Sequence, residues 1–118
     1  MTNSTPSELD IFGFFEVEPT KLDPDAPWIY NTSTYKLDHD GYAVRCELSP
    51  SYSTVKVTLA VDGREVAAAE VAAFTSLRIS TNGAHETLVA RFGESNASAL
   101  FLTLRPHVRL SVVAASDS

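Results

Sequence analysis

The residues that could do chemistry are scattered along this sequence. The three histidines, His39, His85 and His107, lie far apart, and none belongs to a His-x-His pair that could bind a metal from one strand face. Asp38-His39-Asp40 comes nearest to a metal-binding pattern. Gly41 follows it directly, so we interpret the segment as a turn whose aspartates accept backbone hydrogen bonds. The sequence therefore predicts neither a metal nor a cofactor.

A carboxylate pair and a single thiol are the other candidates for chemistry. Glu16 and Glu18 would share one face of a strand and could form an acid–base pair, but nothing near them completes a site. We interpret them as charges that protect an exposed edge. Cys46 has no histidine nearby to activate it, and its alternating neighbours predict a buried position. We expect no catalytic residues, and a site assembled from distant residues remains an alternative.

The segment from Lys21 to Tyr30 most resembles an interaction surface. Three of its features favour this: prolines that stiffen the loop, two aspartates, and the only tryptophan of the chain. Stiff loops lose little entropy on binding, and Trp and Tyr often anchor interfaces. The predicted partner-binding residues are Asp23, Asp25, Trp28, Tyr30, Asp38 and Asp40. The alternative is that Trp28 packs in the core and the prolines only shape the loop.

The negative charge is concentrated near the start of the chain. The net charge of the 118 residues is −6, and residues 1–47, with nine acidic and three basic residues, account for all of it. Such a chain repels nucleic acids and anionic membranes, so neither is expected as a partner. A protein with a basic surface is the better electrostatic match. The alternative is that the charge serves solubility alone.

Alternation of apolar and polar residues dominates the elements that must position these groups. It predicts strands over residues 11–17, 28–38, 42–49, 54–61, 77–81, 86–92 and 100–112, the last interrupted by Pro106 at an edge or bulge. Turns are expected at residues 38–41, 50–53, 62–63 and 82–83, and Asp62-Gly63 favours a type I′ hairpin. Residues 64–71 are predicted to form the return strand, although the alanines of 65–74 make a helix possible.

The aromatic residues near the start pose a packing problem for a strand. Successive strand residues point to opposite faces, so Phe14 and Phe15 could not both enter one core. One of them would then face a partner, a second sheet or another copy of the chain.

The predicted fold class is all-β, a single-domain antiparallel meander of about eight or nine strands that forms a sandwich or a partly open barrel. Residues 1–10 are expected to be a disordered lead, residues 11–113 the β domain, and residues 114–118 a disordered tail. The first ten residues lack the basic and apolar regions of a signal peptide, so a cytoplasmic location is expected.

These observations favour a small acidic module that binds a protein partner. Bacterial immunity proteins and phage-encoded inhibitors are often of this general type, although no motif links the chain to them. We expect an inhibitor or neutralising, immunity-type protein that covers a basic partner surface. One alternative is a small-ligand-binding barrel or an enzyme, with Trp28, Tyr35 and Tyr42 lining a pocket. Another is an assembly or structural subunit that forms a homodimer through an edge strand near Pro106.

Overall fold

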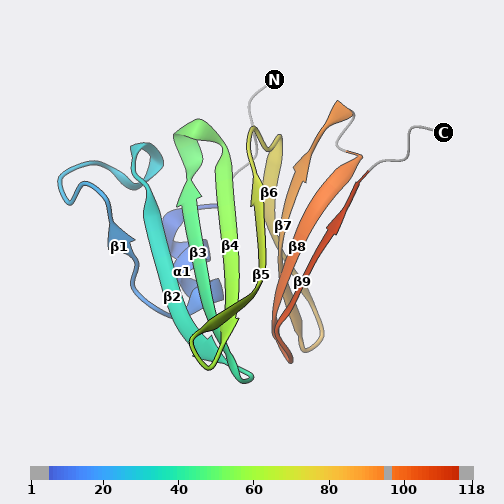
Figure 1. Ribbon diagram of the computed structural model, residues 1–118. Helices are drawn as coiled ribbons and strands as arrows, with labels where there is room; N and C mark the ends of the chain where they lie inside the picture. Colours follow the sequence, from blue (N-terminus) through green and yellow to red (C-terminus); the bar gives the residue numbers. More distant parts are fainter. Residues whose placement is uncertain (1–5, 95–96, 115–118) are drawn as a thin grey trace.

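The computed structural model describes residues 6–94 and 97–114 as one helix, nine strands and two short 3₁₀ turns (Figure 1). The first part of the chain forms α1 (Glu8–Phe15), β1 (Thr20–Lys21), η1 (Trp28–Tyr30), β2 (Ser33–His39), β3 (Tyr42–Ser49), η2 (Pro50–Tyr52), β4 (Thr54–Val61) and β5 (Arg64–Val71). The second sheet contains β6 (Ser76–Asn82), β7 (His85–Phe92), β8 (Ser98–Arg105) and β9 (Arg109–Val113).

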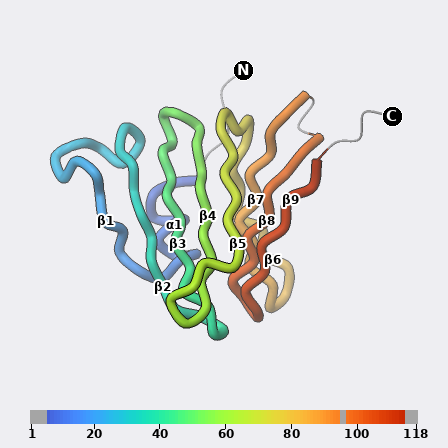
Figure 2. The backbone as a smooth tube through the Cα atoms, viewed as in Figure 1, coloured from blue at the N-terminus to red at the C-terminus, as the bar shows by residue number. Residues whose placement is uncertain are grey.

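The strands form two antiparallel meanders that follow one another along the chain. β1 to β5 make a five-stranded sheet in sequence order, and β6 to β9 make a four-stranded sheet in sequence order. The backbone path in Figure 2 shows the single passage from one sheet to the other, between β5 and β6. The predicted all-β meander of eight or nine strands is therefore confirmed, in the form of two packed sheets.

The hairpin turns lie where the sequence places them, with one shift. Asp62 and Gly63 have φ angles of 51° and 77°, and two successive positive φ angles are the mark of a type I′ turn. The β6–β7 hairpin turns at Gly83 and Ala84, because Asn82 still pairs with His85. This hairpin begins its turn one residue later than predicted, since Gly83 takes the positive φ of 63°.

The first predicted strand is wrong, because these residues form the helix α1. Ser7 caps its N-terminus: the Ser7 Oγ accepts from the Asp10 N–H at 3.1 Å, and the Ser7 N–H donates back to the Asp10 carboxylate at 3.4 Å. The helix begins at Glu8, inside the stretch expected to be a disordered lead, while residues 1–5 lie outside the described residues. No helix in the described parts of the chain is long and apolar enough to cross a membrane.

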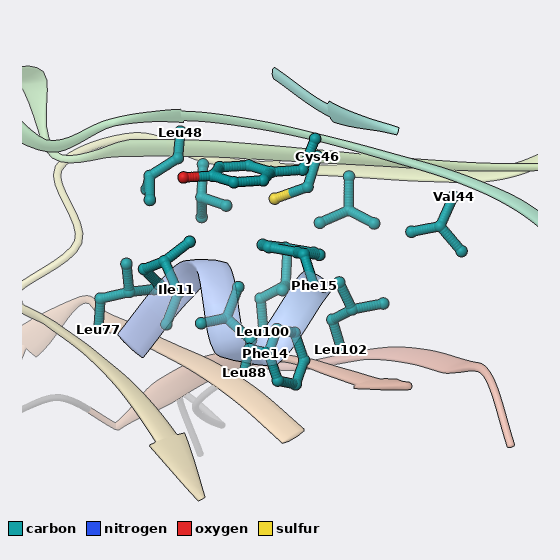
Figure 3. Packing of buried hydrophobic residues seen from close by; sticks show 14 of the residues in the cluster. Ile11, Phe14, Phe15, Val44, Cys46, Leu48, Leu77, Leu88, Leu100 and Leu102 are labelled. Atoms are coloured by element: carbon teal, nitrogen blue, oxygen red, sulfur yellow. The ribbon is translucent and has the colours of Figure 1, made fainter. Parts of the chain in front are cut away.

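Helical geometry resolves the packing problem of the phenylalanines. Ile11, Phe14 and Phe15 fall at i, i+3 and i+4, so all three point to one face and all are buried. Figure 3 shows this face inside the core, with Val44, Cys46 and Leu48 of β3 on one side of the helix and Leu88, Leu100 and Leu102 of β7 and β8 on the other. The helix therefore fills space between the two sheets.

Aromatic contacts fix the helix against the first sheet. The rings of Phe15 and Tyr35 stack with centroids 4.6 Å apart, and Phe14 meets Phe15 edge-on at 4.9 Å. Stacked and edge-to-face pairs of this kind add to the stabilisation that comes from burial alone. Phe12, two positions before Phe14, lies off this buried face and is exposed.

Arg105 of β8 ties the C-terminal end of the helix to the second sheet. Its guanidinium donates to the Phe14 carbonyl at 2.9 Å, to Glu86 at 2.7 Å and to Glu16 at 2.7 Å. The carbonyls of a last helical turn lack partners within the helix, so this cation satisfies one of them. Glu16 and Glu18 therefore do not form the predicted strand pair: Glu16 ends the helix in a left-handed conformation.

Three other predictions need adjustment. The segment predicted as a strand from Trp28 begins with the 3₁₀ turn η1, and the strand starts only at Ser33. Residues 64–71 are a strand, so the helical alternative for 65–74 is wrong. Residues 100–112 are two strands, because the chain reverses after Pro106 and β9 pairs antiparallel with β8. Of the predicted tail, residues 115–118 lie outside the described residues.

Candidate functional site

A buried asparagine organises the loop between β1 and β2. The side-chain amide of Asn31 donates to the carbonyls of Asp23, at 2.6 Å, and Ala26, at 3.1 Å. Its side-chain oxygen accepts from the N–H groups of Asp23, at 3.1 Å, and Thr32, at 3.0 Å. One side chain thus joins both ends of the loop from within, which gives the loop a defined shape in place of a range of conformers.

The two loop aspartates stand on this frame with their carboxylates directed to solvent. The Asp25 N–H donates to Oδ1 of Asp23 at 3.0 Å, and the Ala26 N–H donates to the Asp23 carbonyl at 3.1 Å. This is the local turn that aspartate favours, because its short side chain reaches the backbone two residues on. Asp23 and Asp25 are both exposed, so the turn presents two negative charges close together.

Large apolar side chains are exposed at the same end of the sheet as these charges. Leu22 is 80% exposed, Tyr30 is 70% exposed, and Ile29 is also exposed. Tyr52 of η2 is 77% exposed, and η2 packs against η1 at the same end of the five-stranded sheet, the upper end in Figure 1. The Thr32 and Ser49 hydroxyls, 2.7 Å apart, join the two segments. We call this set the loop-end surface: Leu22, Asp23, Asp25, Ile29, Tyr30 and Tyr52.

Trp28 lies beneath the loop-end surface, in the core. Only 9% of it is exposed, so it agrees with the alternative prediction that Trp28 packs in the core. Its indole N–H, the Ser33 hydroxyl and the Tyr35 hydroxyl are all buried, and none makes a hydrogen bond of good geometry. The pKa of Tyr35 is raised, mainly because burial disfavours the phenolate, while the neighbouring indole and Ser33 hydroxyl oppose that rise.

Asp38 and Asp40 lie at the other end of the same sheet, where β2 turns into β3. Asp38 is exposed, whereas Asp40 joins this hairpin to the β8–β9 connection: its Oδ2 accepts from the Val108 N–H at 3.0 Å, and its Oδ1 lies 3.5 Å from His107 Nδ1. The Val108 hydrogen bond is the main reason that the pKa of Asp40 is lowered. The six predicted contact residues therefore do not form one surface.

The structure adds residues that the sequence prediction did not select. Leu22 and Ile29 lie within the segment from Lys21 to Tyr30, but they were not among the predicted contact residues. Tyr52 lies about twenty residues further on, in what the sequence indicated only as a turn. A large aromatic residue in a short turn between two strands has no core position to occupy, and this signal could have identified it.

The groups considered for chemistry are not brought together. Cys46 is fully buried, and burial raises the pKa of its thiol to about 12. Among residues 6–94 and 97–114, no three side chains of His, Cys, Asp or Glu gather as a metal site would require. Tyr35 borders a hollow of about 400 Å³ beside α1, whereas Tyr42 borders a different hollow near the Asp62-Gly63 turn. Trp28 borders neither, so the pocket proposed from these three aromatics does not form.

Comparisons with known proteins identify a solved structure with a similar fold. Scans of protein-family models and of curated protein sequences find no match to this chain. The structure resembles a chain of the solved contact-dependent growth inhibition toxin–immunity protein complex from Klebsiella pneumoniae 342. The TM-score is 0.78 at 17% sequence identity, and the likeness covers 94% of this chain and 96% of that chain. At this identity the likeness shows a shared fold over almost the whole length of both chains.

Proposed function

We propose that this protein is an immunity-type inhibitor, which binds a partner protein through the loop-end surface and neutralises it by covering a basic region. The observation that carries the proposal is the loop-end surface itself, where two fixed aspartates and the exposed Tyr30 and Tyr52 lie at one end of the five-stranded sheet. The fold gives independent support, since it is shared with a chain from a complex of a toxin and its immunity protein.

The composition of the loop-end surface suits tight protein binding. Tyrosine supplies a large contact area with few rotatable bonds, and exposed Leu22 and Ile29 extend the apolar part. The loop is already ordered by Asn31, so little conformational entropy is lost when a partner binds. Asp23 and Asp25 would pair with lysine or arginine side chains of the partner, which favours correct partners and speeds their approach.

Inhibition by this route requires no catalysis by the inhibitor. A basic region on a partner commonly marks a site for an anionic substrate, and a bound acidic surface would block access to it. The proposed contact set keeps Asp23, Asp25 and Tyr30 from the sequence prediction and adds Leu22, Ile29 and Tyr52. Trp28 supports the loop from below, and Asp38 and Asp40 lie outside the set. We also propose that binding takes place in the cytoplasm.

Co-expression in bacteria tests the proposal. The products of the genes adjoining this one would be expressed singly, and one of them is expected to arrest growth unless this protein is present. Changing Asp23→Lys and Asp25→Lys together should abolish protection and weaken the affinity for the purified partner by about 100-fold, because two attractive charges become repulsive ones. The measurement is growth rate together with affinity by calorimetry.

A matched variant locates the surface. Asp38→Lys with Glu65→Lys makes the same change in charge at the opposite end of the five-stranded sheet, where both residues are exposed. This variant should still protect. Equal loss of protection in the two variants would place the interface elsewhere, and protection against none of the adjoining products would contradict the neutralising function.

A further inference from the structure

The outer face of the four-stranded sheet is cationic, in contrast to the rest of the molecule. Residues 1–71, which include α1 and the five-stranded sheet, hold twelve acidic and five basic residues, a net charge of −7. Residues 72–118 hold three acidic and four basic residues, a net charge of +1. The outward positions of β6 to β9 include three exposed arginines and no acidic residue. The arginines are Arg78, Arg91 and Arg109.

The register of the strands brings these arginines onto one surface. Arg78, Val89, Phe101 and Ser111 stand opposite one another across β6, β7, β8 and β9. Arg91 is opposite Ser76, which makes it a diagonal neighbour of Arg78. Diagonal neighbours in a sheet lie about 7 to 8 Å apart, close enough for two guanidinium groups to hold one anion between them.

None of the three arginines forms an ion pair within residues 6–94 and 97–114. The outer face of the other sheet differs, because acidic residues stand beside its cations. Lys36 is opposite Arg45 there, but Arg45 forms an ion pair with Glu47 at 3.2 Å. Glu47 is also opposite Lys56, which in turn is opposite Glu70. Like charges without partners on neighbouring strands repel one another. An anionic ligand would relieve that repulsion on the four-stranded sheet and would gain little on the five-stranded one.

The cationic face is also hollowed and has an apolar floor. A depression of about 420 Å³ lies on it, bordered by Arg78, Ile79, Ser80, Val89, Arg91 and Phe101. Val89 is only 8% exposed although it points outward, and Phe101 is half-buried. An apolar floor between guanidinium groups suits a ligand that brings both carboxylates and methylene groups, as glutamate does.

We propose that this cationic face binds an acidic polypeptide segment, with Arg78 and Arg91 holding its carboxylates and Val89 and Phe101 contacting its aliphatic carbons. A second copy of the chain does not fit face to face, because arginines would meet arginines. The net charge of −6 opposes any polyanion, and it opposes nucleic acid most because the charge of nucleic acid is densest. The apolar floor also favours the methylene groups of glutamate, which a phosphate backbone lacks. The proposal goes beyond the function proposed above and does not depend on it, because it concerns the opposite charge on the other sheet.

Nuclear magnetic resonance titration of the whole protein with a ten-residue polyglutamate peptide at low salt tests the proposal. Signals of β6, β7 and β8, and the side-chain Nε–H signals of Arg78 and Arg91, should shift together and saturate. Changing Arg78→Gln and Arg91→Gln together should weaken peptide binding about fivefold to tenfold, because two charge-assisted hydrogen-bond donors are lost. Both side chains are exposed, so the fold should persist, as circular dichroism would verify.

A control variant and a control ligand make the result decisive. Lys36→Gln with Arg45→Gln removes the same charge from the outer face of the five-stranded sheet, where the two residues are cross-strand neighbours, and should leave peptide binding unchanged. Equal weakening in both variants, or shifts spread over both sheets, would overturn the proposal. So would tighter binding of a ten-nucleotide single-stranded DNA through the same arginines, which would assign the face to nucleic acid.

Discussion

Asn31 fixes the conformation of the loop that carries the loop-end surface, although Asn31 itself is buried. Four hydrogen bonds connect it to Asp23, Ala26 and Thr32. A buried amide with satisfied donors and acceptors specifies a single arrangement, whereas its removal leaves backbone groups without partners. The exposed contact residues therefore depend on a residue that a partner would not touch.

Asn31→Ala should lower the free energy of unfolding by about 1 to 3 kcal/mol, because buried backbone groups lose their partners. Amide hydrogen exchange at Asp23 and Thr32 should also become faster, which nuclear magnetic resonance measures directly. Tyr30→Ala is the matched comparison: it is expected to change stability by no more than about 0.5 kcal/mol while weakening partner binding. Unchanged exchange in the Asn31 variant would show that the prolines alone fix the loop.

Asp40 is a second residue whose role is structural, since it joins the β2–β3 hairpin to the β8–β9 connection. Its pKa is lowered in the folded state, so its contribution to stability is fully present above the ordinary aspartate pKa and is lost as the pH falls through the lowered value. Asp40→Asn should therefore lower the melting temperature at pH 7.

The difference in melting temperature between Asp40→Asn and the unaltered protein should shrink as the pH falls below about 4, where the carboxylate begins to take up protons in the unfolded chain. Calorimetric melting curves from pH 7 to pH 3 measure it. A difference that stays constant across this range would mean that the carboxylate charge does not stabilise the fold. Asn keeps a hydrogen-bond acceptor and tolerates the φ of 56° at this position, so the substitution isolates the charge.

At the scale of elements, α1 is the part that makes the two sheets into one core. Its buried face contacts the first sheet through Phe15 and Tyr35, and Arg105 binds its last turn from the second sheet. The helix is only eight residues long, and a helix of this length is marginal in isolation. Its stability must therefore come from packing between the sheets and from the Ser7 cap.

Gly13→Ala should raise the free energy of unfolding by about 0.5 to 1 kcal/mol, because glycine weakens a helix interior and a Cβ at this exposed position meets no atom within 4 Å. Gly63→Ala is the opposite case: its φ of 77° belongs to the type I′ turn, so alanine should cost about 1 to 2 kcal/mol there. Chemical denaturation of both variants checks the pair. A destabilising Gly13→Ala would contradict the argument that glycine weakens this helix.

At the scale of the whole molecule, charge is divided between two layers. Residues 1–71, which include the helix and the five-stranded sheet, carry −7, while residues 72–118 carry +1 and include the cationic outer face. The loop-end surface and the cationic face therefore offer opposite charges to solvent. A partner that meets one of them gains nothing from the other unless it is large enough to reach both.

The association rate with the basic partner proposed above should fall as the salt concentration rises, because exposed charges are screened over about 10 Å at 0.1 M. In the Asp23→Lys, Asp25→Lys variant this dependence should flatten or reverse, and in the Arg78→Gln, Arg91→Gln variant it should persist. Stopped-flow measurements at several salt concentrations separate the two surfaces. A slope that follows the arginines instead would assign the partner to the four-stranded sheet.

Local patterns in the sequence determined most of the strands. Alternation over eight residues identifies β3 and β4, and Asp62-Gly63 marks the hairpin that follows β4, because period-two burial and turn geometry are set within a few residues. The loop that precedes Trp28 was also recognisable, since proline and aspartate restrict the backbone locally.

Only the tertiary structure decided which distant residues meet. The aromatic segment of α1 suits a strand by composition, and it is helical because Ser7 caps it and the space between two sheets accepts one face of a helix. The turn η2, which holds Tyr52, packs against η1, which holds Tyr30. Asp40 accepts a hydrogen bond from Val108 and so lies outside the contact surface. Both contacts connect segments that are far apart in the sequence. The cationic face likewise depends on the register of four strands. Such adjacency is set by how the strands pair and the sheets pack, and no short stretch of sequence encodes it.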